Sequence, residues 1–215
     1  GEVVVMDGIK LLIDERMARQ NIEKVVRGQH TRHERAILRD ELRLDDRLME
    51  LGGGIGTVAI TASRIIGSEN VLSFEANPTI EDLIRKNYAL NDVSPTLKIN
   101  LVGEEYGTQT FYVNERFSRS SMIKPEGESR PVPVPVVPFA EELARFKPTF
   151  LVVDIQGSEK DFLRYADLSS IRSLLIEFHP SMIGFNEIAK LRKLLRIKHG
   201  YKEVRRTSNC YLYKR

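Results

Sequence analysis

The stretch Glu50-Leu51-Gly52-Gly53-Gly54-Ile55-Gly56-Thr57 decides the fold class of this chain. An apolar run ends in an acid, three glycines then occupy alternate positions, and a helical pattern of apolar residues follows. A strand with such an exit loop lets a ligand approach the backbone, because glycine has no side chain and tolerates positive φ. The stretch therefore predicts a ligand site at the end of a core strand.

Spacing narrows the choice of ligand. A phosphate loop of the nucleoside-triphosphatase type needs Gly-Lys followed by Ser or Thr, and this loop has no lysine. The dinucleotide fingerprint needs Gly or Ala three residues after its second glycine, where this chain has Thr57. An acid at Glu50, two residues before the first glycine, is poorly placed for a pyrophosphate. A ligand that carries positive charge fits this loop better.

Strands and helices alternate along most of the chain, which favours a parallel sheet with helices on both faces. A hairpin and helices are expected in about residues 1–46. Apolar runs predict core strands at 48–51, 71–75, 97–102, 149–154 and 171–178, and a terminal hairpin at 201–206 and 210–213.

The middle of the chain is less regular. Residues 110–113 are expected to form a strand, and residues 116–130 a loop that either closes over a substrate or is an ordinary surface insertion. Prolines at 131, 133, 135 and 138 remove ladder donors, so we expect an extended edge segment there and no central strand.

Size and composition point to one globular domain over residues 1–215. The chain is 41% hydrophobic, and it has no run of about 18 apolar residues that would predict a membrane span. Neither a secretory leader nor an internal disulfide is expected, since Cys210 is the only cysteine, and we expect a cytoplasmic protein. A net charge of +3 is too small to predict nucleic-acid binding. The basic last 26 residues form either a solvated face or a docking surface for an anionic substrate or partner.

The glycine stretch resembles the first motif of class I S-adenosylmethionine-dependent methyltransferases, an acid followed by three alternating glycines. Glu75 ends the second strand, about 20 residues after the glycine loop, and matches the acid that holds both ribose hydroxyls in that superfamily. Two adjacent hydroxyls donate well to one carboxylate, and the charge strengthens both bonds. The resemblance implies a Rossmann-like, seven-stranded, mostly parallel sheet with a C-terminal antiparallel hairpin.

Within that superfamily the chain resembles the FkbM-type methyltransferases, which mainly O-methylate sugars and natural products. The resemblance runs from about Gly28 to Tyr213 and is carried by four segments: 74–78 (Phe-Glu-Ala-Asn-Pro), 117–122 (Phe-Ser-Arg-Ser-Ser-Met), 153–159 (Val-Asp-Ile-Gln-Gly-Ser-Glu) and 176–180 (Ile-Glu-Phe-His-Pro). The family usually has an acid where this chain has Gln156, so a role that needs a carboxylate at that position is in doubt.

The expected cofactor is S-adenosyl-L-methionine. The residues expected to bind it are Glu50, Gly52, Gly53, Gly54, Glu75, Ala76 and Asn77, together with Glu34, whose segment precedes the first core strand and could fold over the methionine end. A solvated helix start is the competing interpretation of Glu34.

Three residues are catalytic candidates. Asp154 ends a core strand, where open parallel sheets bind ligands, and would act as a base or would orient the acceptor; its alternative role is a helix cap. His179 can accept a proton near neutral pH, and Glu159 lies in a first helical turn, where a carboxylate also favours the helix dipole. With Glu177 these residues form either an acid and base set or a divalent-metal site, but their spacing matches no recognised metal signature, so no metal is expected.

The predicted function is O-methylation of a small hydroxylated acceptor, with no nucleic-acid or membrane partner and an open oligomeric state. N- or C-methylation on the same fold, a non-catalytic cofactor-binding module and an NAD-dependent dehydrogenase are the alternatives.

Overall fold

The computed structural model describes residues 1–114 and 128–215, and its centre is a seven-stranded sheet in the order β11-β12-β10-β9-β3-β4-β5. The sheet strands are β3 (Leu48–Leu51), β4 (Val71–Glu75), β5 (Thr96–Ile99), β9 (Phe150–Val153), β10 (Ser173–Glu177), β11 (Lys202–Thr207) and β12 (Cys210–Lys214). The first five pair in parallel, whereas β12 pairs antiparallel with β10 and with β11. This confirms the predicted mostly parallel sheet with an antiparallel C-terminal hairpin.

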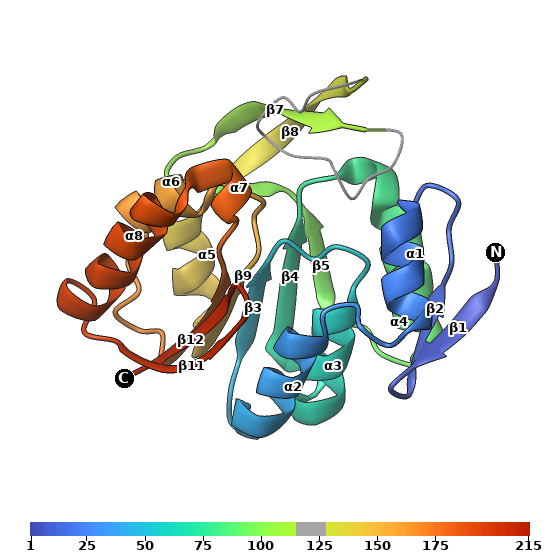
Figure 1. Cartoon of the computed structure of the whole chain (residues 1–215), viewed down its shortest axis with the longest axis horizontal. Coiled ribbons are helices and arrows are strands. Elements are labelled where there is room, and N and C mark those ends of the chain that lie inside the picture. Colours follow the sequence, from blue (N-terminus) through green and yellow to red (C-terminus); the bar gives the residue numbers. More distant parts are fainter. Residues whose placement is uncertain (115–127) are drawn as a thin grey trace.

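Helices cover both faces of the sheet, as Figure 1 shows. They are α1 (Arg19–Val26), α2 (Arg32–Glu41), α3 (Thr57–Ile66), α4 (Glu81–Leu90), α5 (Phe139–Phe146), α6 (Glu159–Tyr165), α7 (Pro180–Ile183) and α8 (Phe185–Ile197), with 3₁₀ turns η1 (Ser68–Asn70) and η2 (Pro78–Ile80). Buried strands explain the arrangement. Along β9, Phe150 and Val152 pack with the α1 to α4 face, while Leu151 and Val153 pack with the α6 and α8 face. Alternate side chains of a strand point to opposite faces, so a continuous apolar run suits a sheet covered on both sides.

The N-terminal hairpin, β1 (Val3–Met6) and β2 (Ile9–Leu12), is fixed to the domain by polar side chains of α4. The backbone N–H groups of Lys10 and Leu12 donate to the side-chain oxygens of Asn91 and Asn87, both at 2.9 Å. Asn87 in turn donates to the carbonyl of Ile55 in the glycine loop. The hairpin is thereby connected to the ligand loop through one asparagine.

A second, three-stranded sheet has the order β6-β8-β7, with β6 (Leu101–Gly103), β7 (Gly107–Val113) and β8 (Arg130–Pro138). In Figure 1, β7 and β8 lie above the main sheet. Two predictions fail here. The expected strand 97–102 is divided at Asn100 into β5 and β6, which belong to different sheets, and the proline segment is the middle strand of its sheet.

The proline pattern itself explains the second failure. Backbone N–H groups alternate in direction along a strand, so prolines at 131, 133 and 135 remove donors from one side only. The intervening residues keep their N–H groups for β7, which pairs with β8 from Arg130 to Val136. On the other side, β6 pairs only with residues 136–138. Alternating prolines therefore permit a strand that has a long ladder on one edge alone.

Candidate active site

The glycine loop joins β3 to α3 and approaches two neighbouring strand ends. Gly52, Gly54 and Gly56 have φ values of 94°, 53° and 94°, which favour glycine. A Cβ atom on Gly52 would lie 1.8 Å from the carbonyl oxygen of Asp154, and one on Gly53 would lie 2.6 Å from the Ser73 hydroxyl. Apart from its own chain neighbours, no described residue places a heavy atom within 4 Å of the Cβ position of Gly54. The loop can thus present bare backbone to a ligand.

Glu75 ends β4 beside this loop and is only 8% exposed. Its two carboxylate oxygens accept hydrogen bonds from the backbone N–H groups of Gly54 and Asn77, both at 2.8 Å. Burial raises the pKa of Glu75, and those backbone donors oppose the rise. The side-chain amide nitrogen of Asn77 is buried and has no partner among the described residues. Fixed backbone bonds hold the carboxylate in place while each oxygen keeps a lone pair for a ligand hydroxyl.

Glu50 lies beneath the loop and accepts a hydrogen bond from the Ser73 hydroxyl at 2.7 Å. Burial raises the pKa of Glu50 to about 8; the serine bond opposes this, and the charges of Glu75 and Glu34 add to it. None of the described lysines and arginines pairs with Glu50, and a buried acid of this kind favours a cationic ligand nearby. This agrees with the sequence argument that Glu50 suits a positively charged ligand.

One cavity of about 730 Å³ brings most of the predicted residues together. Its lining includes all eight residues predicted to bind the cofactor, together with Asp154: Glu34, Glu50, Gly52, Gly53, Gly54, Glu75, Ala76, Asn77 and Asp154. The second sheet and α6 complete the wall, with Tyr106, Phe111 and Tyr165 among the lining residues. The predicted serine loop, residues 116–130, lies almost entirely outside the described part of the chain.

The N-terminal segment supplies one wall of the cavity through His30, Thr31 and Glu34. Thr31 has a positive φ of 48°, and its hydroxyl lies 2.8 Å from that of Thr57 at the start of α3. Burial, with the charges of Lys24 and Arg35, lowers the pKa of His30 to about 4, which makes this imidazole neutral at pH 7. These residues of the N-terminal segment thus line the same cavity as the glycine loop, while their role toward a cofactor stays a prediction.

Asp154, His179 and Glu159 form a chain of contacts at the edge of the cavity. The Asp154 Oδ1 atom lies 3.3 Å from Nε2 of His179, whose Nδ1 lies 2.6 Å from Oε1 of Glu159. Of the three, Asp154 lines the cavity, whereas His179 and Glu159 lie outside its lining and are reached through Asp154. His179 and Glu159 can therefore influence a substrate only through Asp154, unless the imidazole ring of His179 moves toward the cavity.

The surroundings of Asp154, His179 and Glu159 are strongly acidic. Asp154 keeps 29% of its side chain exposed, yet burial in the cavity and the charge of Glu34 raise its pKa to about 7. Burial and the charges of Asp154 and Glu34 raise the pKa of Glu177 to about 9. Burial alone would lower the pKa of His179, but the hydrogen bond to Glu159 and the charges of Glu159 and Glu177 together outweigh burial, and the net shift is upward. These groups can exchange protons near neutral pH.

Gln156 departs from the resembling family at this point. It has a positive φ of 51°, lines the cavity and donates from Nε2 to Oδ1 of Asp154 at 3.3 Å. At this position an acid would place one more negative charge beside Asp154, whereas Gln156 provides an uncharged amide donor.

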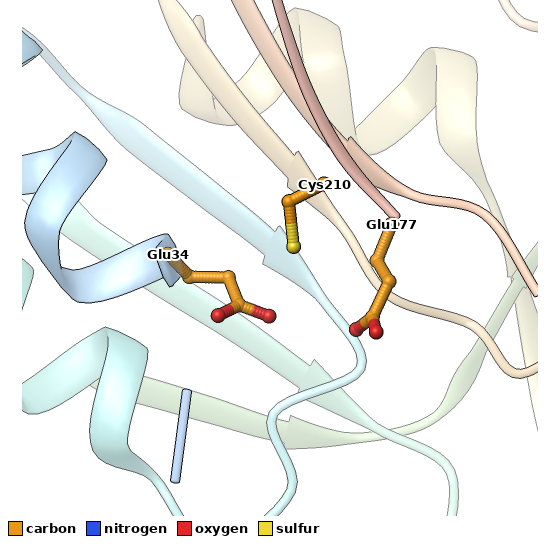
Figure 2. Close-up of side chains that lie close together, drawn as sticks. All are labelled: Glu34, Glu177 and Cys210. Atoms are coloured by element: carbon orange, nitrogen blue, oxygen red, sulfur yellow. The ribbon is translucent and has the colours of Figure 1, made fainter. Parts of the chain in front are cut away.

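Cys210 lies beside the acidic residues of the site, a position that no sequence pattern predicts. It forms a direct cross-strand pair with Glu177, and Figure 2 shows its sulfur between the carboxylates of Glu177 and Glu34. Burial and the nearby charges of Glu34 and Glu177 raise the pKa of this thiol above its usual range, so it stays protonated. The sequence pointed to Glu177, two residues before His179, but not to Cys210. The contact between Glu177 and Cys210 depends on the register of the antiparallel strands β10 and β12.

These features fit S-adenosyl-L-methionine. The glycine backbone leaves room that a side chain would fill, Glu75 has free acceptor capacity for ribose hydroxyls, and the buried acids favour a sulfonium and an ammonium. Together with the sheet order, the loop and its acids define a class I S-adenosylmethionine-dependent methyltransferase.

The chain belongs to the FkbM methyltransferase family. The model of the methyltransferase FkbM domain matches residues 52–203, more than two thirds of the 215 residues. The protein is therefore a methyltransferase that uses S-adenosyl-L-methionine. This excludes the alternative of an NAD-dependent dehydrogenase.

Two solved structures share the fold. The ribosomal protein L11 methylase from Lactobacillus delbrueckii subsp. bulgaricus is 13% identical, with a TM-score of 0.51 over 86% of this chain and 77% of that chain. The Pyrococcus abyssi tRNA (uracil-54, C5)-methyltransferase, in complex with S-adenosyl-L-homocysteine, is 12% identical, with a TM-score of 0.52 over 99% of this chain and 43% of that chain. At such identities the likeness concerns the fold alone. No curated protein matches the chain in sequence. None of the helices in the described ranges is long and apolar enough to cross a membrane.

Proposed function

We propose that this methyltransferase transfers a methyl group to a hydroxyl of a small molecule, such as a sugar or a natural product. The observation that supports this most is Asp154, a cavity-lining carboxylate whose pKa lies at about 7 and which is backed by His179 and Glu159. An alkyl hydroxyl is a poor nucleophile at neutral pH, so its proton must be taken or its oxygen activated as the new bond forms.

The proposal assigns the cofactor to the glycine side of the cavity. Glu75 would accept both ribose hydroxyls, the backbone of Gly52 to Gly54 would hold the adenosyl and methionine parts, and Ala76 and Asn77 would border the base; all of these residues line the cavity. Glu34 and Glu50 favour the positive charge at the other end. When bound, the cofactor supplies a methyl group on a sulfonium, which is the electrophile for an in-line displacement.

On the acceptor side, Asp154 takes the hydroxyl proton or orients the hydroxyl toward the methyl group. His179 holds Asp154 through Nε2, and Glu159 fixes the imidazole by its bond to Nδ1. Positioning of this kind supplies much of the acceleration in a displacement between two bound groups.

One observation favours a second candidate, N-methylation. The carboxylates of Glu34, Asp154 and Glu177 would attract a protonated amine as well as they would attract a metal or a cofactor cation. The amine must lose its proton before it attacks, and Asp154 could accept that proton too.

A transfer assay with methyl-labelled cofactor tests the proposal against matched libraries of sugars, glycosides and amines. The expected result is label in a hydroxyl-bearing acceptor, with Asp154→Asn lowering kcat by roughly 10²-fold or more while S-adenosylhomocysteine binding persists. Asp167, which is exposed and is not among the lining residues, provides the control variant Asp167→Asn. Label only in amines would overturn O-methylation, and cofactor binding without transfer to any acceptor would favour the non-catalytic module.

A further inference from the structure

Three potential metal ligands meet at the carboxyl ends of β9 and β10. Asp154, Glu177 and His179 each offer one ligand atom, and these atoms all lie within 4.8 Å of one another. Ligands about 2.1 Å from one ion lie at most about 4.2 Å apart, so modest side-chain rotations would bring all three onto a common ion.

No fixed cation balances the charge of this cluster. Among the described residues, no lysine or arginine forms an ion pair with Glu34, Asp154 or Glu177. Figure 2 shows the carboxylate of Glu34, which is only 9% exposed, directed from α2 toward Glu177 and Cys210. Three carboxylates that converge with His179 as the one basic group among the described residues need shared protons or a bound cation.

The imidazole of His179 is oriented as metal-binding imidazoles are. Its Nδ1 lies 2.6 Å from the fully buried carboxylate of Glu159, which is itself held by the backbone N–H of Gly157 at 3.0 Å. With Nδ1 committed to that bond, Nε2 is the ring nitrogen that faces Asp154, at 3.3 Å, and it can bind a metal ion once its proton is displaced. A carboxylate behind the histidine fixes its tautomer and raises its basicity as a ligand.

We propose that Asp154, Glu177 and His179 bind one divalent cation at the acceptor side of the cavity. Two carboxylates and one imidazole form a mostly hard ligand set that suits Mn²⁺, with Mg²⁺ as the weaker alternative. Three protein ligands leave positions open for a substrate oxygen. The neighbouring group of Glu34, Glu177 and Cys210 is less suitable, because its sulfur is a protonated thiol.

The role of the cation rests on the proposed hydroxyl transfer, whereas its binding does not. A coordinated hydroxyl loses its proton to solvent more readily, because the positive charge stabilises the oxygen anion. That oxygen then forms the bond to the methyl carbon, the carbon–sulfur bond breaks, and its electron pair stays on sulfur, which becomes a neutral thioether. The inference thus assigns Asp154 the orienting role.

A titration of the metal-stripped protein with Mn²⁺ tests the metal site directly. The electron paramagnetic resonance signal of the free ion decreases as the ion binds, so its loss measures binding. We expect one Mn²⁺ per chain, at least a tenfold weaker affinity in Glu177→Gln and Asp154→Asn, and loss of the site in the double variant. Glu187→Gln, which removes a carboxylate on α8 that pairs with Lys160 and Lys190, should bind Mn²⁺ as the wild type does. Circular dichroism verifies that each variant is folded.

The possible results separate this inference from the proposed function. Absence of binding in the wild type, with and without S-adenosylhomocysteine, would overturn the metal site, as would binding that the double variant retains. Hydroxyl transfer that proceeds at full rate in excess EDTA would overturn its role and leave O-methylation standing. A Mn²⁺ site that depends on these residues in a protein that methylates only amines would support the site and overturn the proposed acceptor.

Discussion

At the scale of single residues, Glu50 links the site to stability. Its pKa is about 8 in the folded chain, because burial disfavours the charge, against an ordinary value of 4.5. The folded state therefore holds this proton more tightly than the unfolded state does. Its contribution to stability is complete below about pH 4.5 and is lost as the pH rises toward 8.

Glu50→Gln should remove the loss of stability that accompanies a rise in pH. The glutamine keeps an oxygen that accepts the Ser73 hydroxyl, but it does not ionise. Without cofactor, we expect the Tm of Glu50→Gln to match that of the wild type near pH 5 and to exceed it at pH 8.5. A gain of about 1 kcal/mol or more corresponds to roughly 2–4 °C or more for a chain of this size.

Thermal unfolding by circular dichroism at both pH values measures the effect. The exposed Asp45 offers a control, since Asp45→Asn should shift the Tm equally at the two pH values. If Glu50→Gln also shifted the Tm by the same amount at pH 5 and at pH 8.5, the buried carboxyl of Glu50 would not titrate between these pH values.

Residue patterns predicted the cofactor side of the cavity better than the acceptor side. Glu50, the glycines and Glu75 lie within one strand-loop-helix unit and the next strand end, so spacing along the chain places them. The contact between Glu177 and Cys210 joins residues 33 positions apart and requires the register of an antiparallel pair. No local pattern encodes that register, which is why the acidic cluster with Cys210 was not predicted.

At the scale of elements, the segment between β2 and β3 depends on Arg35. This side chain is fully buried, with its guanidinium 2.6 Å from Asp7 of the hairpin turn. It also donates to the carbonyl oxygens of Gly28 and His30, at 3.1 and 3.2 Å. One arginine thus ties the N-terminal hairpin and α2 to the loop that carries His30 into the cavity wall.

Arg35→Met should therefore weaken both stability and ligand binding. Two partly buried carbonyls and Asp7 lose a charged donor, so we expect a loss of roughly 2–4 kcal/mol in the free energy of unfolding. S-adenosylhomocysteine should bind severalfold more weakly, because the wall of the cavity loses its support. Urea denaturation and calorimetric titration measure the two effects.

Arg39→Met is the matched control for this prediction. Arg39 lies one turn further along α2, contacts the same Asp7 at 3.7 Å and is 44% exposed. An exposed ion pair contributes about 0–1 kcal/mol, so this variant should resemble the wild type. Equal effects in the two variants would contradict a special role for Arg35.

The element scale also shows where sequence patterns mislead. The alternating prolines of β8 predicted an edge, and the strand is an edge toward only one side for most of its length. The alternating apolar and polar residues of 97–102 predicted one strand, but the segment is divided at Asn100, and its two halves bury apolar residues in different clusters.

At the scale of the whole molecule, the cavity includes N-terminal residues that the family match leaves out. The match begins at Gly52, whereas the lining begins at Met17 and ends at Tyr165. The hairpin residues Met6, Ile9 and Leu11 are buried in the same cluster as residues of α3, β4 and β9. This arrangement supports the single-domain expectation, which remains a prediction until unfolding is measured.

We therefore expect one cooperative transition that a bound ligand shifts as a whole. S-adenosylhomocysteine at 100 times its Kd should stabilise the protein by about 2.7 kcal/mol, because it binds the folded state alone. For a chain of this length that gain raises the Tm by roughly 5–10 °C. Far-UV circular dichroism, which reports on helices and strands, and tyrosine fluorescence should give coincident curves with and without ligand, as two-state unfolding requires. NAD at the same concentration should leave the Tm unchanged, since the loop lacks the dinucleotide spacing. Two separate transitions, of which the ligand shifts only one, would mean that the N-terminal segment folds apart from the sheet and that Glu34 joins the cavity only when the segment docks.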